Sequence, residues 1–209
     1  MNMNPETRQR RLQAVIDAAE QVFTRKGIDK STMQDVATQA QMGVATVFRF
    51  FPKKEKLVVA VATKMLEEVL QEFHAVAAQP ETSLRKLEIL FDSSIALLER
   101  KDSSGVKLLE NFESYAAQFT EPLDDIGMFN AVYRKISGVF STIIEQGKQD
   151  GSIRADLPIQ DTLRTVMNTF GIFARKLSLQ KNILVIEQDL DPAEQLQILK
   201  HILLSYLKP

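Results

Sequence analysis

Apolar residues recur at the spacing of an α-helix along almost the whole chain, and this pattern is the strongest constraint on its fold. In residues 12–23, 58–73 and 129–143 they return at positions i, i+3, i+4 and i+7, which places them on one face of a helix. Weaker stripes of the same period occupy residues 83–100, 105–118, 159–180 and 192–207. No stretch alternates apolar and polar residues for long enough to indicate a strand. The sequence therefore predicts an all-α fold of about nine helices, two of them short and located between residues 32 and 50.

Composition narrows the class of protein further. The chain has 209 residues, of which 44% are hydrophobic and 25% charged, values that are typical of a globular protein rather than a disordered or fibrous one. It contains no cysteine, which excludes disulfides, thiolate nucleophiles and cysteine-based metal sites. Its two histidines, His74 and His201, have no neighbour at the spacing of metal ligands. We therefore expect no metal and no cofactor.

No segment has the pattern of a membrane span, a secretion signal or a catalytic site. Apolar runs fall short of the ~20 residues that cross a bilayer, and the first residues lack the apolar core of a signal peptide. Nucleophile elbows, phosphate-binding glycine loops and paired catalytic carboxylates are also missing from the sequence. We therefore expect a cytoplasmic protein that contacts no membrane and is not an enzyme.

Charge is distributed unevenly along the chain. Residues 1–57 contain ten lysines and arginines against six acids, a balance of +4. The remaining residues contain 16 basic and 21 acidic side chains, a balance of −5, so the formal net charge of −1 hides the difference. A basic N-terminal part favours a polyanionic partner such as DNA.

The segment 31–50 has the pattern of two short helices separated by a tight turn. Thr32 and Asp35 are spaced as a capping box, in which each side chain accepts a hydrogen bond from the backbone N–H of the other residue. The helix that this box opens ends before a turn at 41–43, and a second short helix follows over 44–50. Two short helices across a tight turn, braced by a third helix, form a helix-turn-helix.

The second short helix has an inner and an outer face. Val47, Phe50 and Phe51 are spaced to pack inward. The side chains at the start of the outer face are small, and the face ends in the guanidinium group of Arg49. This group can donate two hydrogen bonds to guanine or to a phosphate. The residues of the outer face are Val44, Ala45, Thr46, Phe48 and Arg49. Three lysines follow at the start of the next helix, whose N-terminal dipole also favours phosphate: Lys53, Lys54 and Lys56.

From about Arg10 to Leu57 the sequence resembles the DNA-binding domain of TetR-family transcriptional regulators. The unbroken run from Thr46 to Leu57 matches the end of the family pattern. The matching residues before it are Ala18, Ala19, Phe23, Gly27, Thr32, Val36, Ala37 and Ala40. The resemblance implies a helix-turn-helix DNA-binding domain at 1–57 and a helical domain for effector binding and dimerisation at 58–209.

The resemblance also implies roles on DNA. It assigns phosphate contacts to Thr32, Thr46, Lys54 and the position of Phe48, and base contacts to Val44, Ala45 and Arg49. We add Gln34 to these candidates. Two residues depart from the family pattern. Phe48 replaces a tyrosine and lacks its hydroxyl contact to phosphate, and Gln41 replaces the glycine of the turn, which implies a strained or altered turn and an additional polar contact to DNA.

Three arginines near the N-terminus, Arg8, Arg10 and Arg11, have two interpretations. They belong either to a frayed, solvated terminus or to an arm that lies along phosphates or in the minor groove. We retain them as candidate DNA contacts.

Aromatic and methionine side chains are numerous on the helical stripes of the C-terminal domain. Each alone is most simply a core residue, but together they exceed what a tightly packed small bundle needs. Following the resemblance, we expect a cavity for a small apolar or amphipathic ligand. Its predicted lining residues are Phe91, Phe112, Tyr115, Phe119, Met128, Phe129, Tyr133, Met167 and Phe170.

The last helical stripe, over 192–207, has apolar residues on more than one face. One face can cover the core of its own chain, and the second needs a partner. By the resemblance this partner is a second copy of the chain, which would form a four-helix interface together with the helix at 159–180. Burial of the whole helix within a monomer is the alternative. The predicted interface residues are Leu163, Phe173, Ile198, Ile202 and Tyr206.

These patterns together predict a homodimeric transcription regulator that binds a palindromic double-stranded DNA operator. Repression that is relieved by a small-molecule effector is the most frequent mode in the family, and activation is the alternative. Two other classes stay open. One is an enzyme fused to a DNA-binding domain, for which no catalytic pattern is present. The other is a helical protein-interaction module that has lost DNA binding, an interpretation that Phe48 and Gln41 would favour.

Overall fold

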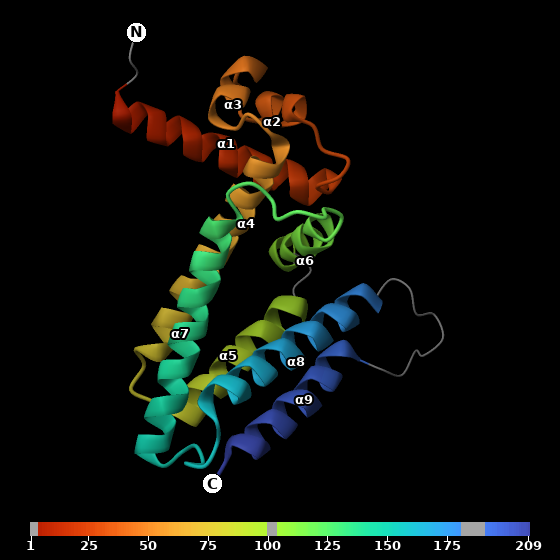
Figure 1. The fold of residues 1–209 in the computed structure, drawn as a ribbon. Coiled ribbons are helices and arrows are strands. Elements are labelled where there is room, and N and C mark those ends of the chain that lie inside the picture. The colour runs from red at the N-terminus through yellow and green to blue at the C-terminus, as the bar shows by residue number, and fades with distance from the viewer. Residues whose placement is uncertain (1–3, 100–103, 181–190) are drawn as a thin grey trace. The chain divides into compact units, whose positions relative to one another are not determined.

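The computed structural model describes residues 4–99, 104–180 and 191–209, and no strand occurs within these ranges (Figure 1). The helices are α1 (Pro5–Lys26), α2 (Met33–Gln39), α3 (Val44–Phe50), α4 (Lys54–Ala77), α5 (Ser83–Glu99), α6 (Ser104–Ala116), α7 (Ile126–Asp150), α8 (Ile159–Gln180) and α9 (Pro192–Leu207). The prediction of an all-α fold with about nine helices is therefore confirmed for the described part of the chain. None of these described helices combines the length and the apolar composition that a membrane span requires.

Contacts divide the chain into two compact units. The first unit comprises Met1–Glu68 and Ser104–Tyr133, and the second comprises Val69–Ser103 and Arg134–Pro209. The chain passes from one unit to the other within α4, returns directly before α6, and passes over again within α7. The first unit thus includes α6 and the start of α7, although both are distant in sequence from the helix-turn-helix. The functional division at residue 57 stays a prediction.

One buried cluster stabilises the helix-turn-helix in the first unit. It contains Val36 of α2 and Val47 of α3, which are buried together with Val15, Ala19 and Val22 of α1. Because α2 and α3 have only seven residues each, their own backbone hydrogen bonds would leave them marginal in water. Full burial of a valine contributes about 1.5–3 kcal/mol relative to an exposed position. Packing of α2 against α1, and of α3 against α2 within the same cluster, therefore accounts for the stability of both short helices.

Helix α6 belongs to the same core. Leu108, Phe112 and Tyr115 are buried in this cluster, and α6 contacts α1 directly. The ring of Phe112 lies 4.8 Å from the ring of Phe129, which is part of α7 and packs against the cluster. Three of the aromatic residues predicted to contact a ligand thus contribute to the core of the first unit.

Capping residues set helix boundaries at the predicted positions. The Thr32 hydroxyl accepts a hydrogen bond from the Asp35 N–H at 3.1 Å, and the Asp35 carboxylate accepts one from the Thr32 N–H at 3.0 Å. This capping box at the start of α2 is therefore confirmed. At the start of α9, Asp191 accepts from the Ala193 N–H at 2.9 Å, and Pro192 occupies the first helical position.

In the second unit, the end of α7 caps the first turn of α5. Asp150 accepts hydrogen bonds from the backbone N–H and the hydroxyl of Ser83 at 3.0 and 2.8 Å, and the Ser152 hydroxyl accepts from the Leu84 N–H at 3.2 Å. These bonds satisfy N–H groups that have no partner within the helix. Partial burial raises the pKa of Asp150, but hydrogen bonds from Ser152 and Ser83 outweigh this effect and lower the pKa to about 2. Asp150 is therefore charged at neutral pH, beside the positive end of α5.

Gly147 allows α7 to approach this capped turn closely. A Cβ atom at this position would lie 2.5 Å from Ile153 Cδ1 and 2.9 Å from Ser83 Cβ. Ile153 is fully buried, and its N–H donates to the Gly147 carbonyl at 2.9 Å. Ile153 and Ser83 are both buried, so neither can turn into solvent to make room.

We predict that Gly147→Ala destabilises the chain by about 1–3 kcal/mol, because the added methyl group overpacks a closed contact. The matched control is Gly138→Ala in the same helix, where an added Cβ atom meets nothing within 4 Å. This control should be neutral or stabilising by up to ~1 kcal/mol, since alanine is the better helix former. Denaturant unfolding followed by circular dichroism measures both variants. Equal stability of the two would contradict the close approach at Gly147.

Candidate nucleic-acid interface

Phe50 and Phe51, at the end of α3, pack inward, as the sequence predicts. Val47 of α3 is fully buried, Phe51 is buried directly after the helix, and Phe50 is half-buried against the same core. This packing fixes the rotation of α3 about its own axis. The opposite side of the helix is therefore turned away from the core.

Ala45, Phe48 and Arg49 form the exposed side of α3, which we call the recognition face. The Phe48 side chain leaves 44% of its surface exposed, a large fraction for an aromatic ring. Thr46 is half-buried, and Val44 is half-buried and packs against the core. Of the three residues predicted to contact bases, Ala45 and Arg49 thus face solvent, and Val44 is turned partly inward.

The start of α2 contains two further candidates, Thr32 and Gln34, and both are exposed. The Thr32 hydroxyl also donates to Asp35 Oδ2 at 2.9 Å. Lys26 Nζ lies 2.5 Å from the other carboxylate oxygen of Asp35. The hydrogen bonds from Lys26 and from Thr32 lower the pKa of Asp35 to about 2. The carboxylate is therefore ionised at neutral pH and holds the Thr32 side chain in one position.

Gln41 has a left-handed backbone conformation in the turn between α2 and α3, with φ at 54°. The next residue, Met42, donates its N–H to the Ala37 carbonyl at 2.9 Å, which closes the turn as in a Schellman motif. Glycine usually occupies this position, because a left-handed backbone crowds any Cβ atom. The altered turn expected from the sequence thus retains its glycine-type geometry with a glutamine, whose side chain is exposed.

Gln41→Gly should stabilise the chain by about 0.5–1 kcal/mol, because relief of the left-handed strain exceeds the added entropy of a glycine in the unfolded chain. The same substitution at Gln34, inside α2, is the matched control and should destabilise by roughly 1 kcal/mol. Thermal unfolding midpoints compare the two variants with the parent chain. A lower midpoint for Gln41→Gly would mean that the glutamine side chain makes a stabilising contact larger than the strain.

Lys54, predicted to contact phosphate, is half-buried at the start of α4. Its Nζ donates to the Asp29 carbonyl at 3.3 Å and lies 5.9 Å from the centroid of the Tyr115 ring. Partial burial lowers the pKa of Lys54, and the charges of Asp29 and Glu55 oppose this shift. Burial also raises the pKa of Tyr115 to about 12, so the ring beside the lysine stays neutral.

The lysines on either side of Lys54 form ion pairs with the connection before α7. Lys53 Nζ lies 2.9 Å from Asp124 Oδ2, and Lys56 Nζ lies 2.9 Å from Asp125 Oδ2. The hydrogen bond between Lys53 and Asp124 raises the pKa of the lysine and lowers that of the acid. Sequence reasoning missed both acids, because they lie 71 and 69 residues along the chain from their partners.

The first unit as a whole is not basic. Residues 1–57 have a charge balance of +4. The other residues of this unit, 58–68 and 104–133, contain two basic and seven acidic side chains, a balance of −5. The net charge of the unit is therefore −1. The basic N-terminal part found in the sequence is therefore neutralised within its own unit. Attraction of this unit to DNA depends on where its charges lie and not on its net charge.

The three N-terminal arginines, Arg8, Arg10 and Arg11, lie in the first turns of α1 and are exposed. Asn4 caps this helix by accepting from the Glu6 N–H at 3.3 Å, and a proline occupies the first helical position. The three arginines thus belong to α1 rather than to an extended arm, and their contact with DNA stays a prediction.

The residues predicted to line a ligand cavity divide between the two units. The first unit contains Phe112, Tyr115, Phe119, Met128, Phe129 and Tyr133, and the second contains Phe91, Met167 and Phe170. In the first unit Phe119, Met128 and Tyr133 are exposed. In the second unit the buried rings of Phe91 and Phe170 lie 4.7 Å apart and join α5 to α8, and Met167 is half-buried.

Helix α9 exposes a stripe of apolar residues. Ile198, Ile202 and Tyr206 each leave more than half of their surface exposed, at the i, i+4, i+8 spacing of one helix face. Helix α9 packs against α8, where Ile172 is also highly exposed and Phe173 is half-buried. Sequence reasoning missed Ile172, although it adjoins Phe173. The side chain of Leu163, also predicted at this interface, lies outside the described part of the structure.

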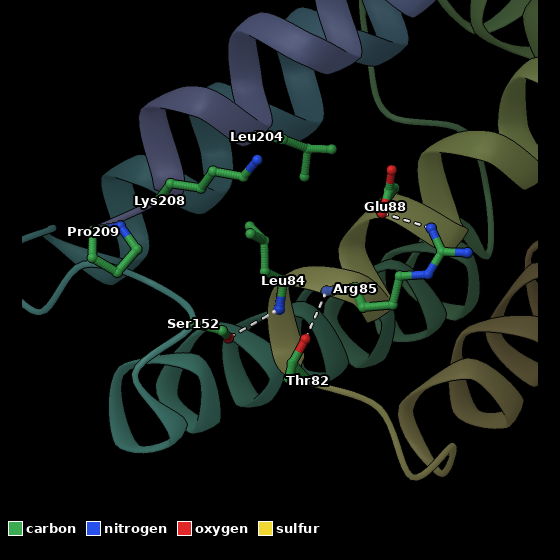
Figure 2. Close-up of a pocket in the computed structure, with 8 residues that line it drawn as sticks. All are labelled: Thr82, Leu84, Arg85, Glu88, Ser152, Leu204, Lys208 and Pro209. Carbon is green, nitrogen blue, oxygen red and sulfur yellow. Dashed lines mark hydrogen bonds and ion pairs between the residues drawn. The ribbon is translucent and has the colours of Figure 1, made fainter.

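A pocket of about 420 Å³ lies in the second unit at the start of α5, the connection after α7 and the end of α9 (Figure 2). Its lining residues are Thr82, Leu84, Arg85, Glu88, Ser152, Leu204, Lys208 and Pro209. Two of its polar contacts are internal, since Arg85 pairs with Glu88 at 2.6 Å and Ser152 caps Leu84. Sequence reasoning missed this pocket, because segments distant in sequence form it and none carries an aromatic stripe.

Comparison with known proteins adds independent information. Residues 15–61 match the family described as "Bacterial regulatory proteins, tetR family". The transcriptional repressor KstR2 of Rhodococcus jostii is 21% identical over 161 residues, which cover 77% of this chain and 76% of that protein. The transcriptional regulator LuxR of Vibrio harveyi is 39% identical over 64 residues, which cover 31% of this chain and 29% of that protein.

A solved structure extends the likeness to the whole fold. The fatty acid degradation regulator FadR from Bacillus halodurans has a TM-score of 0.71 and 15% identity, over 98% of this chain and 97% of that one. The family match at 15–61 includes the capping box, the left-handed turn and the recognition face. Residues 15–61 thus belong to the tetR family of bacterial regulatory proteins, and the relatives identify the chain as a helix-turn-helix transcriptional regulator rather than an enzyme.

Proposed function

We propose that this regulator is a homodimeric repressor that acts in the cytoplasm, binds a palindromic DNA operator and is released from it by a small apolar or amphipathic ligand. The observation that carries the proposal is the recognition face of α3. Ala45, Phe48 and Arg49 are exposed there on a helix whose other side is buried, so their orientation is fixed before DNA arrives. A fixed helix face of this kind suits the major groove of B-DNA.

Base contacts and phosphate contacts fall to different residues in this proposal. Arg49 donates two hydrogen bonds to the O6 and N7 atoms of a guanine, and the small Ala45 lets the helix backbone approach the floor of the groove. Phe48 has no hydroxyl for a phosphate and offers an apolar contact, for which a thymine methyl group is suited. The phosphate contacts are Thr32, Thr46 and Lys54, with Gln34, Gln41 and the arginines of α1 beside them.

The apolar stripe of α9 supports a dimer. Ile198, Ile202 and Tyr206 would be unfavourably exposed in an isolated subunit, together with Ile172 of α8. Pairing of α8 and α9 with the same helices of a second copy buries this stripe in a four-helix interface. A two-fold dimer then presents two recognition helices to half-sites ~34 Å apart, or to a larger spacing, on a palindromic operator.

Ligand-induced release follows from a difference in affinity. The buried ring pair Phe91 and Phe170, with Met167 beside it in α8, gives the second unit the kind of apolar and aromatic side chains that line ligand pockets. A ligand that binds better to the conformation that does not fit the operator shifts the dimer to that conformation. The description of a relative as a repressor, and of a solved structure of the same fold as a fatty acid degradation regulator, supports this mode and an apolar ligand.

We predict that Arg49→Ala weakens binding to the operator by about 1–3 kcal/mol per half-site and relaxes base preference at one position. The operator is first selected from genomic fragments with the wild-type protein. Gel shifts on the selected fragment, and on a panel with single base changes, then measure both effects. The genes beside the selected fragment also identify candidate ligands for release assays.

The matched control for this experiment is Arg134→Ala, which removes an exposed arginine of α7 in the second unit and should leave operator affinity unchanged. If the wild-type protein selects no DNA, or if Arg49→Ala discriminates bases as the wild type does, the proposal is wrong. Activation in place of repression would appear as lower transcription of the neighbouring genes in cells that lack the regulator.

Ile202→Asp should convert the dimer into a monomer, because it places a charge within an apolar interface. The monomer should also lose most of its operator affinity, since one recognition helix then binds alone. Sedimentation velocity measures the mass, and gel shifts measure the affinity. Gln197→Asp, at an exposed position of α9 outside the stripe, is the control and should stay dimeric. A dimeric Ile202→Asp variant would place the interface elsewhere.

A further inference from the structure

Two adjacent acids in the connection between α6 and α7 meet the start of α4. Asp124 pairs with Lys53 and Asp125 with Lys56, and we call these two acids the acid pair. The side chains of Lys53 and Lys56 remain 63% and 30% exposed. The ion pairs therefore lie at the surface of the first unit, where another anion can reach the same two lysines.

The backbone holds the acid pair in place. Leu123 on one side is buried in the core of the first unit, and Ile126 on the other side packs against the same core. Asp125 has a left-handed conformation, with φ at 65°, and its carbonyl accepts from the Met128 N–H at 3.0 Å at the start of α7. Because the chain is anchored on both sides, the two carboxylates meet the lysines without ordering a flexible loop. This lowers the entropic cost of the ion pairs.

The two lysines flank Lys54, which the proposed function assigns to a DNA phosphate. Lys53 lies directly before α4 and Lys56 lies in its first turn, where the helix dipole and the lysine charges together favour an anion. A carboxylate and a phosphate present the same kind of ligand to an ammonium group, namely an anionic oxygen. Asp124 and Asp125 already supply that ligand to Lys53 and Lys56.

We propose that the acid pair is a built-in competitor of the operator phosphates for Lys53 and Lys56. This inference rests on the proposed DNA-binding function. A lysine that neutralises a DNA phosphate releases a counterion from the DNA, whereas a lysine that stays paired with a carboxylate releases none. With both ion pairs closed, Lys53 and Lys56 add nothing to operator affinity. Lys54, whose partners are a carbonyl group and an aromatic ring, remains available to phosphate.

The double variant Asp124→Asn/Asp125→Asn tests this competition, because it removes both charges and preserves side-chain shape. Asparagine also tolerates the left-handed backbone at position 125. The full-length variant and wild type are titrated with the selected operator at salt concentrations from about 50 to 200 mM. The dependence of log K on log salt should become steeper by about 0.9 per freed lysine, or roughly 3.6 for the four lysines of a dimer. Affinity at the lowest salt concentration should rise about tenfold or more.

Two further variants make the result specific. Glu121→Gln removes an exposed acid from the same connection and should leave the salt dependence at the wild-type value. Adding Lys53→Gln and Lys56→Gln to the double variant should return the salt dependence to the wild-type value as well, since no lysine is left to be freed. Circular dichroism unfolding verifies that each variant is folded.

Two results would overturn the inference. An unchanged salt dependence with unchanged affinity would mean that Lys53 and Lys56 lie away from the phosphates. A lower affinity with the wild-type salt dependence would mean that the acid pair orients α4 instead of competing with DNA. Failure of the proposed function looks different, because the wild-type protein itself would then bind no operator, and the inference would fall with it.

Discussion

Burial of the short helices in one cluster with α1 is the interaction on which the recognition face depends. Helices α2 and α3 have seven residues each and are too short to be stable alone. Val36 and Val47 anchor them in a core that also contains Val15 and Ala19. Because Val47 is fully buried, α3 cannot rotate without opening this core, and Arg49 keeps its outward direction. The chemistry of DNA contact is therefore set by apolar residues that would not touch DNA.

The same core changes how the charges of this protein are understood. Residues 1–57 are basic, but the compact unit that contains them has a net charge of −1. Two acids from the connection after α6, Asp124 and Asp125, are brought to the start of α4 beside the buried Leu123. Hydrophobic packing thus decides which lysines at the start of α4 meet a carboxylate. Counting charges along the sequence does not identify them.

Local patterns in the sequence predicted most of the fold and part of the site. The helical stripes located the helices, the spacing of Thr32 and Asp35 predicted the capping box, and the apolar spacing of Phe50 and Phe51 predicted that they pack inward. These features depend on residues within a few positions of one another, and a single sequence records such neighbours directly.

Features that depend on distant segments could not be predicted in the same way. The pairs of Lys53 with Asp124 and of Phe91 with Phe170 join residues about 70 to 80 positions apart, and no periodicity encodes such partners. Helical stripes also cannot tell which of two neighbouring cores an aromatic residue enters. Tyr115 and Phe112, which the sequence predicts to line a ligand cavity, are buried in the core of the first unit, and their contact with a ligand stays a prediction.

The contribution of α6 to that core means that the compact unit that contains the helix-turn-helix is not a contiguous piece of sequence. A fragment that ends at residue 57 or 68 would leave the hydrophobic side of α1 uncovered where Leu108, Phe112 and Tyr115 pack. A chimera that takes residues 1–57 from one relative and the rest from another would pack α1 of the first protein against α6 of the second. Transferring operator specificity to a new effector domain requires that residues 104–133 travel with the helix-turn-helix, or that only the exposed residues of α3 are exchanged.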